Sequence, residues 1–118
     1  MNIIFGRENV GTLTERYTVL ELDTIKFSDD REITAFCVVE NIPINHLPQL
    51  ESMRNLHENL LLNYRKRDWN YCTQALEYLK GFWNHELDTY YDNLQSRIAK
   101  EIELGDREDW DWKIHKSF

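Results

Sequence analysis

The fold is decided by the stretch Leu56–Trp112, at whose centre stands Tyr64-Arg65-Lys66-Arg67-Asp68-Trp69. This phrase predicts the end of one helix, a tight turn and the start of the next helix. Its three basic residues would complement the dipole at the end of the first helix. Asp68 is a good N-terminal cap for the second. The stretch therefore predicts paired amphipathic helices, which usually form binding surfaces and not catalytic pockets.

Apolar residues spaced three to four apart extend the pattern to three antiparallel helices over 48–104. The first begins at or just after Pro48, the second begins at Asp68, and the third runs from near Asn84 or His85 to a cap at Gly105. The expected apolar stripes are Leu50, Met53, Leu56, Leu60 and Tyr64, then Trp69, Cys72, Ala75, Leu79 and Phe82, then Leu87, Tyr90, Leu94, Ile98 and Ile102.

The residues before the helices read as β-structure. Residues 2–5 form a short strand, 8–15 about two turns of helix, and 16–27 and 32–40 a hairpin with a four-residue loop. The second hairpin strand is apolar on both faces, so we expect it inside the sheet with residues 2–5 beside it. On the first strand we expect the leucines in the core and the carboxylates outside. A sheet of about three strands needs a helical cover.

The expected fold is α+β: a small, mostly antiparallel sheet of about three strands packed on the three-helix unit. We expect one domain over 1–118, with a β-rich part (1–41), a linker (42–47), the helical part (48–104) and an acidic tail that carries tryptophan (105–118). With 42% apolar and 30% charged residues, the composition is that of a globular protein.

The formal charge of −7 is spread over both halves of the chain. It disfavours nucleic acid and anionic membrane as partners. The chain shows no secretory leader and no run of the ~18 apolar residues that a membrane span needs. Cys37 and Cys72 fit buried free thiols better than a disulfide. These features predict a cytoplasmic protein.

The turn and the following Ala75-Leu76-Glu77-Tyr78-Leu79 resemble the turn and second helix of a tetratricopeptide repeat. Cys72 stands where such repeats often have alanine, and Arg67 where they often have glycine. Only one copy is visible, so the resemblance implies a lone helical pair with the third helix as its cap.

Residues 56–114 also resemble the helical tail that follows the catalytic domain of many bacterial adenylate and guanylate cyclases. The matching positions are Tyr64 with Asp68-Trp69, then Ala75, then Tyr91 with Arg97, then Asp109-Trp110-Asp111; Trp112 replaces a glycine. The remaining residues cannot hold a cyclase domain, so this likeness implies an accessory fold and no activity.

The whole chain resembles small uncharacterised proteins of large tailed cyanophages, through residues 2–6, 17–23 and 37–41. That resemblance implies a viral protein in the host cytoplasm, with no activity attached.

No catalytic, metal or cofactor site is expected. Glu21, Asp23 and Glu40 could converge on a metal, but a solvated strand face is the favoured interpretation. The histidines lack ligand spacing, and His57 is expected to be half-buried beside an apolar stripe.

The candidate partner-binding residues are Arg65, Lys66, Arg67, Trp69, Tyr90, Trp110 and Trp112. The basic residues could hold a phosphate or an acidic peptide. Tyr90 and Tyr91 are adjacent and cannot both face the core, so one of them is expected at the surface or at an interface. For the tail, an exposed docking segment and the packing of one tryptophan on the third helix are equally open.

These features favour a non-enzymatic module that binds a protein partner. The alternative is a self-associating structural protein, a homodimer with Tyr90, Trp83 and the sheet edge as its interface. An acidic mimic of nucleic acid and a small enzyme are the weaker hypotheses.

Overall fold

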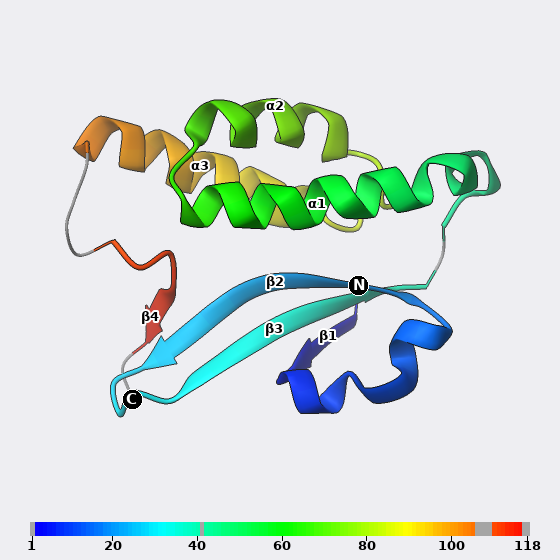
Figure 1. Cartoon of the computed structure of the whole chain (residues 1–118), viewed down its shortest axis with the longest axis horizontal. Helices are drawn as coiled ribbons and strands as arrows, with labels where there is room; N and C mark the ends of the chain where they lie inside the picture. The colour runs from blue at the N-terminus through cyan, green and yellow to red at the C-terminus, as the bar shows by residue number, and fades with distance from the viewer. Residues whose placement is uncertain (1, 41, 106–109, 117–118) are drawn as a thin grey trace. The chain divides into compact units, whose positions relative to one another are not determined.

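A sheet and a set of helices make up the computed structural model, which describes residues 2–40, 42–105 and 110–116 (Figure 1). The fold is α+β, as the sequence predicts. The chain forms two compact units: Met1–Asn41 with Trp112–Phe118, here called the sheet unit, and Ile42–Asp111, here called the helical unit.

The sheet unit contains four described strands in the order β1-β3-β2-β4. Their bounds are β1 Asn2–Phe5, β2 Thr18–Phe27, β3 Glu32–Val39 and β4 Ile114–Lys116. β3 pairs antiparallel with both β1 and β2, so its predicted central place is confirmed. The sheet is larger than predicted because β4, from the tail, pairs parallel with β2.

The burial of β2 and β3 follows their side-chain patterns. On β2, Leu20 and Leu22 are buried, whereas Glu21 and Asp23 are half-exposed, as predicted. On β3 every residue from Ala35 to Val39 is buried. The pairing of β2 with β3 shifts by one residue between Glu21 and Thr24, which is a β-bulge.

The segment between β1 and β2 differs from the predicted two turns of α-helix. It forms two short 3-10 helices, Arg7–Asn9 and Gly11–Glu15, with Val10 buried between them. Gly11, the first residue of the second 3-10 helix, has a φ of 52°, a left-handed conformation that interrupts a continuous α-helix here.

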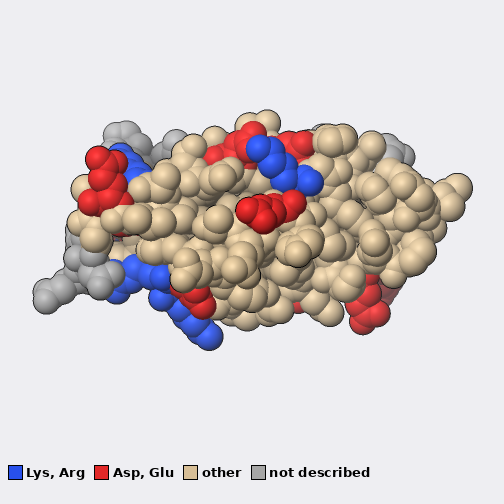
Figure 2. Space-filling view, turned by 90° about the horizontal axis from the view of Figure 1, so that it is seen from above, with Lys and Arg blue, Asp and Glu red and all other residues tan. Residues whose placement is uncertain are grey.

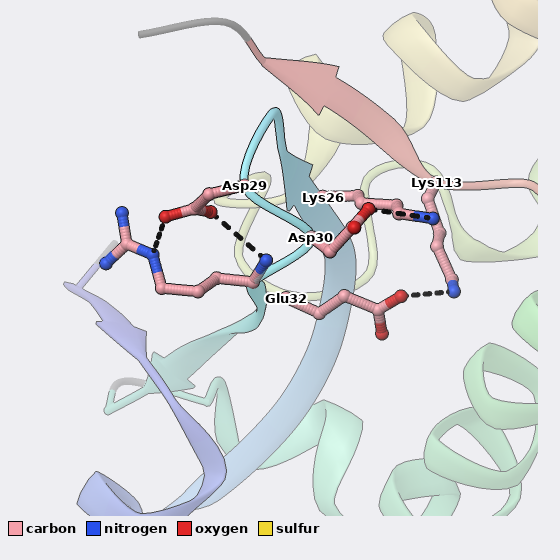
Figure 3. A network of polar contacts seen from close by, with 6 residues as sticks. Lys26, Asp29, Asp30, Glu32 and Lys113 are labelled. Carbon is pink, nitrogen blue, oxygen red and sulfur yellow. Dashed lines mark hydrogen bonds and ion pairs between the residues drawn. The ribbon is translucent and has the colours of Figure 1, made fainter.

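Charged side chains surround the turn of the hairpin (Figure 3). Arg31 Nε lies 2.8 Å from Asp29 Oδ2, and Lys26 Nζ lies 3.9 Å from Asp30 Oδ1. Lys113, just before β4, places its Nζ 2.5 Å from Glu32 Oε1 at the start of β3. This last ion pair fixes the tail beside the hairpin, where Ile114 pairs with Ile25.

The helical unit contains α1 Leu50–Arg65, α2 Trp69–Leu79 and α3 Asp88–Leu104, with successive helices antiparallel (Figure 1). A 3-10 helix, Ile44–Gln49, occupies most of the expected linker. The described residues bear out three helices and the cap at Gly105, whose φ is 77°. The tetratricopeptide-like arrangement stays a prediction.

The third helix begins later than predicted. Asn84 and His85 have φ values of 53° and 62°, so neither can belong to a right-handed helix. Asp88 organises this connection instead. Its carboxylate accepts a hydrogen bond from the Gly81 N–H at 2.7 Å and lies 2.8 Å from His85 Nδ1.

A polar network lies in the core of the helical unit. Trp83 Nε1 donates to Tyr91 Oη at 2.9 Å, and Tyr91 Oη lies 2.9 Å from His57 Nδ1. His57 is 0% exposed, so the prediction that it is half-buried was wrong. A histidine can be fully buried here because the tyrosine hydroxyl supplies a hydrogen-bond partner for its ring.

Candidate functional site

Three aromatic rings meet at the turn between α1 and α2. Tyr64 lies in the last turn of α1, Trp69 opens α2, and Trp110 comes from the segment after α3. The ring centroids are 5.7 Å apart for Tyr64 and Trp69, 5.4 Å for Tyr64 and Trp110, and 5.7 Å for the two tryptophans. All three contacts are edge-to-face, the favoured geometry for aromatic pairs.

The turn itself is built as its sequence predicts. Asp68 caps α2 by accepting a hydrogen bond from the Tyr71 N–H at 3.2 Å. The Asp68 N–H donates to the Asn63 carbonyl at 2.9 Å, and the Arg67 N–H donates to the Tyr64 carbonyl at 3.1 Å. These bonds hold Tyr64 and Trp69 on either side of a turn of fixed geometry.

Arg67 has a φ of 63°. This is the position where the tetratricopeptide resemblance leads one to expect glycine, and the left-handed conformation is the reason that glycine suits it. The turn thus keeps the geometry of a glycine turn with an arginine in it.

Three consecutive cations accompany the rings. Lys66 is exposed, whereas Arg65 and Arg67 are half-buried and make further interactions. The structure therefore brings together five predicted contact residues and Tyr64. We call this set the turn surface; its members are Tyr64, Arg65, Lys66, Arg67, Trp69 and Trp110.

The two tail tryptophans do not form one free docking segment. Trp110 is half-buried against Tyr64 and Trp69, so its ring packs at the α1–α2 turn. Its indole Nε1 is buried and has no hydrogen-bond partner among the described residues. Trp112 belongs to the sheet unit, where Lys113 Nζ lies 5.5 Å from the centre of its ring.

Tyr90 does not lie with the other candidates. It is 8% exposed and Tyr91 is 1% exposed, so the prediction that one of them is at the surface was wrong. Both rings are tilted against His57, with centroids 6.2 Å and 5.8 Å from it. Tyr90 and Tyr91 also contact each other, with ring centroids 5.7 Å apart, so both neighbouring positions on α3 are buried in one cluster with His57.

The carboxylates of the sheet unit do not converge. Glu21 Oε1 lies 2.9 Å from Arg7, and Glu40 Oε1 accepts from Asn2 Nδ2 at 2.7 Å. Within residues 2–40, 42–105 and 110–116, no group of three histidine, cysteine or acidic side chains could hold a metal ion.

The thiols are free and buried, as predicted. Burial and the negative charge of Asp68 raise the pKa of Cys72 to about 12, so this sulfur is a neutral thiol near pH 7. Cys72 Sγ lies 3.8 Å from the Leu60 carbonyl oxygen, which fits a small residue that lets α1 and α2 approach.

Comparison with known family models, curated protein sequences and solved structures finds no match to this chain. In the described part of the chain, no helix combines the length and the apolar character that a membrane crossing requires.

Proposed function

We propose that this chain is a non-enzymatic module that binds a protein partner through the turn surface of its helical unit. The observation that carries the proposal is the set of three rings in mutual edge contact beside three consecutive cations. Trp69 and Trp110 remain half-exposed, and Lys66 is exposed, so apolar area and positive charge are offered together.

The chemistry of the turn surface fits an acidic segment with an aromatic or aliphatic anchor. Tryptophan and arginine supply most of the energy in many interfaces, because they cover large areas. The rings are already held by one another and by the capped turn, so little freedom is lost on binding. Carboxylates of the partner would meet Lys66 and the neighbouring guanidinium groups.

We also propose a cytoplasmic setting for this module. Free buried thiols are typical of a reducing compartment, which supports action in the cytoplasm, and in a host cytoplasm if the chain is phage-encoded.

An acidic mimic of nucleic acid needs a continuous acidic face. Figure 2 shows instead, on the face in view, separate acidic and basic groups within a largely neutral surface.

Peptide binding tests the proposal directly. We expect an acidic peptide with a central tryptophan or leucine to change the tryptophan fluorescence of the native protein, and Lys66→Glu to abolish the effect. Lys100→Glu makes the same charge change at an exposed position away from the turn, on α3, and serves as the matched control. Equal responses from both variants and the native protein would show that the turn surface is not the binding site.

A second pair of variants can be used to capture partners. Trp69→Ala should lose a partner that the native protein retains, whereas Tyr78→Ala, which removes an aromatic residue that is 71% exposed on α2, should keep it. Circular dichroism of each variant confirms that it is folded. A thermal-shift screen with divalent metals and nucleotides tests the enzyme alternative, and clear stabilisation by one of them would favour it.

A further inference from the structure

β1 forms one edge of the four-stranded sheet and pairs with β3 on its inner side. Among the described residues, no strand pairs with its outer side. Ile3 is 43% exposed and Phe5 is 54% exposed. The strand carries no charge and no proline, the usual protections of a sheet edge.

The hydrogen bonds show which backbone groups face outward. The Gly6 N–H donates to the Thr34 carbonyl at 2.8 Å and continues the register of β1 with β3. In an antiparallel pair, alternate residues bond to the neighbouring strand. Asn2 and Ile4 therefore face β3, and the N–H and C=O groups of Ile3 and Phe5 point away from it.

One of these outward groups is already occupied. Asn9 Nδ2 donates to the Phe5 carbonyl at 2.7 Å, which closes that end of the edge. Ile3 keeps both its N–H and its C=O directed outward, and Phe5 keeps its N–H. The open edge is therefore short and centred on Ile3.

We propose that β1 is a self-association edge, to which a second copy of this chain adds its own β1 antiparallel about a two-fold axis at Ile3. A residue with a free donor and a free acceptor is complementary to itself. The two Ile3 residues would exchange two hydrogen bonds, and their exposed side chains would lie side by side on one face. The Asn9 contact disfavours a register centred on Phe5.

The contact is small. A four-residue strand falls well short of the roughly 800 Å² per partner that a stable interface buries. Each copy also carries a formal charge of −7, so the copies repel one another at low salt. The expected dimer is therefore weak, reversible and strengthened by salt. It does not depend on the turn surface, which lies in the helical unit.

Sedimentation velocity over a concentration series, at low and at high salt, tests the proposal. The native protein should shift toward a dimer as concentration and salt rise. Ile3→Lys and Phe5→Lys should stay monomeric, because a charge on the edge blocks strand addition. Ile44→Lys is the matched control, since Ile44 is 85% exposed in the helical unit, and it should dimerise like the native protein. A native protein that stays monomeric throughout, or an Ile3→Lys variant that still dimerises, overturns the proposal.

Disulfide trapping tests the register. A two-fold axis at Ile3 puts the two Ile3 Cα atoms about 5.5 Å apart, within the ~4.4–6.8 Å range of a disulfide. Ile3→Cys should therefore give a covalent dimer on mild oxidation. Ile4→Cys should not, because its own copies would be offset along the strand.

Both cysteine variants are made in a Cys37→Ala background, because Cys37 lies opposite Ile3 on β3 and would compete for it. Equal trapping at both positions, or none at Ile3, overturns the register. If the Cys37→Ala protein does not fold, the sedimentation series alone decides.

Discussion

Removal of one hydroxyl group should destabilise the helical unit strongly. Tyr91 Oη accepts a hydrogen bond from Trp83 Nε1 and pairs with His57 Nδ1, both at 2.9 Å. All three side chains are fully buried. Tyr91→Phe keeps the ring and its packing, so the change isolates the loss of the hydroxyl.

The magnitude follows from what the hydroxyl leaves behind. An indole N–H donates only one hydrogen bond, and Trp83, which is fully buried, would lose it. One buried group without a partner costs about 1–3 kcal/mol, and the His57 ring loses its hydrogen bond with this hydroxyl as well. We expect Tyr91→Phe to lower the free energy of unfolding by about 2–4 kcal/mol.

Urea denaturation, followed by circular dichroism at pH 7, measures this loss. The midpoint urea concentration should fall, while the slope of the unfolding free energy against urea concentration stays constant. Tyr78→Phe is the matched control, since the same change at an exposed tyrosine should stay within about 0.5 kcal/mol. In a double-mutant cycle, Trp83→Phe with Tyr91→Phe should cost less than the sum of the single changes, because no indole is then left without a partner. A loss below about 0.5 kcal/mol in Tyr91→Phe, or strict additivity, would refute the reasoning.

Three further outcomes can be measured on the same preparations. Because burial and Asp68 raise the pKa of Cys72 to about 12, its alkylation near pH 8 should be slow and should accelerate with urea as the chain opens; rapid labelling in native buffer would contradict this. Burial alone would raise the pKa of Asp88, but the hydrogen bonds from His85 and the Gly81 N–H and the nearby positive charges lower this pKa below the ordinary ~3.9. The ionised Asp88 carboxylate therefore stabilises the fold above about pH 4, and this stabilisation is lost as the pH falls further. In Asp88→Asn the free energy of unfolding should therefore decrease less steeply below pH 4 than in the native protein. The same pH dependence in both proteins would exclude this stabilising role of Asp88. Arg67→Gly should stabilise the protein by about 0.5–1 kcal/mol, because glycine adopts a φ of 63° without strain, whereas Arg67→Ala should not.

The sequence predicts those parts of the fold that local patterns encode. The apolar spacing of the helices, the Asp68 cap and the four-residue hairpin loop all depend on residues near one another in the chain. The cap and the loop are confirmed, and so is most of the spacing. Ile102 was wrongly placed in the buried stripe of the third helix, because it is 58% exposed. The start of α3 was misplaced because Asn84 and His85 have no pattern that reveals two left-handed residues. β4 was missed because a strand of three residues is too short to show alternation, and its partner β2 lies far away in sequence.

The candidate site was predictable to the same extent. The turn, its cations and Trp69 follow from adjacent residues. The closure of the aromatic cluster by Trp110 joins segments that are distant in sequence, so no local signal distinguishes it from a free tail. Tyr90 was misassigned because helical periodicity gives adjacent residues different faces, whereas here a buried histidine accommodates both tyrosine rings.

The strain at Arg67 links stability to the proposed function. A non-glycine residue in a left-handed conformation is destabilising, yet this one stands in the same turn as the aromatic cluster and the cations. Strained residues persist when surrounding structure over-determines them and often lie at functional sites. If the guanidinium group serves binding, Arg67→Gly should gain stability and lose affinity for the acidic peptide. A variant that gains stability and binds the peptide unchanged would separate the strain from the function and leave the proposal to rest on Lys66 and the rings.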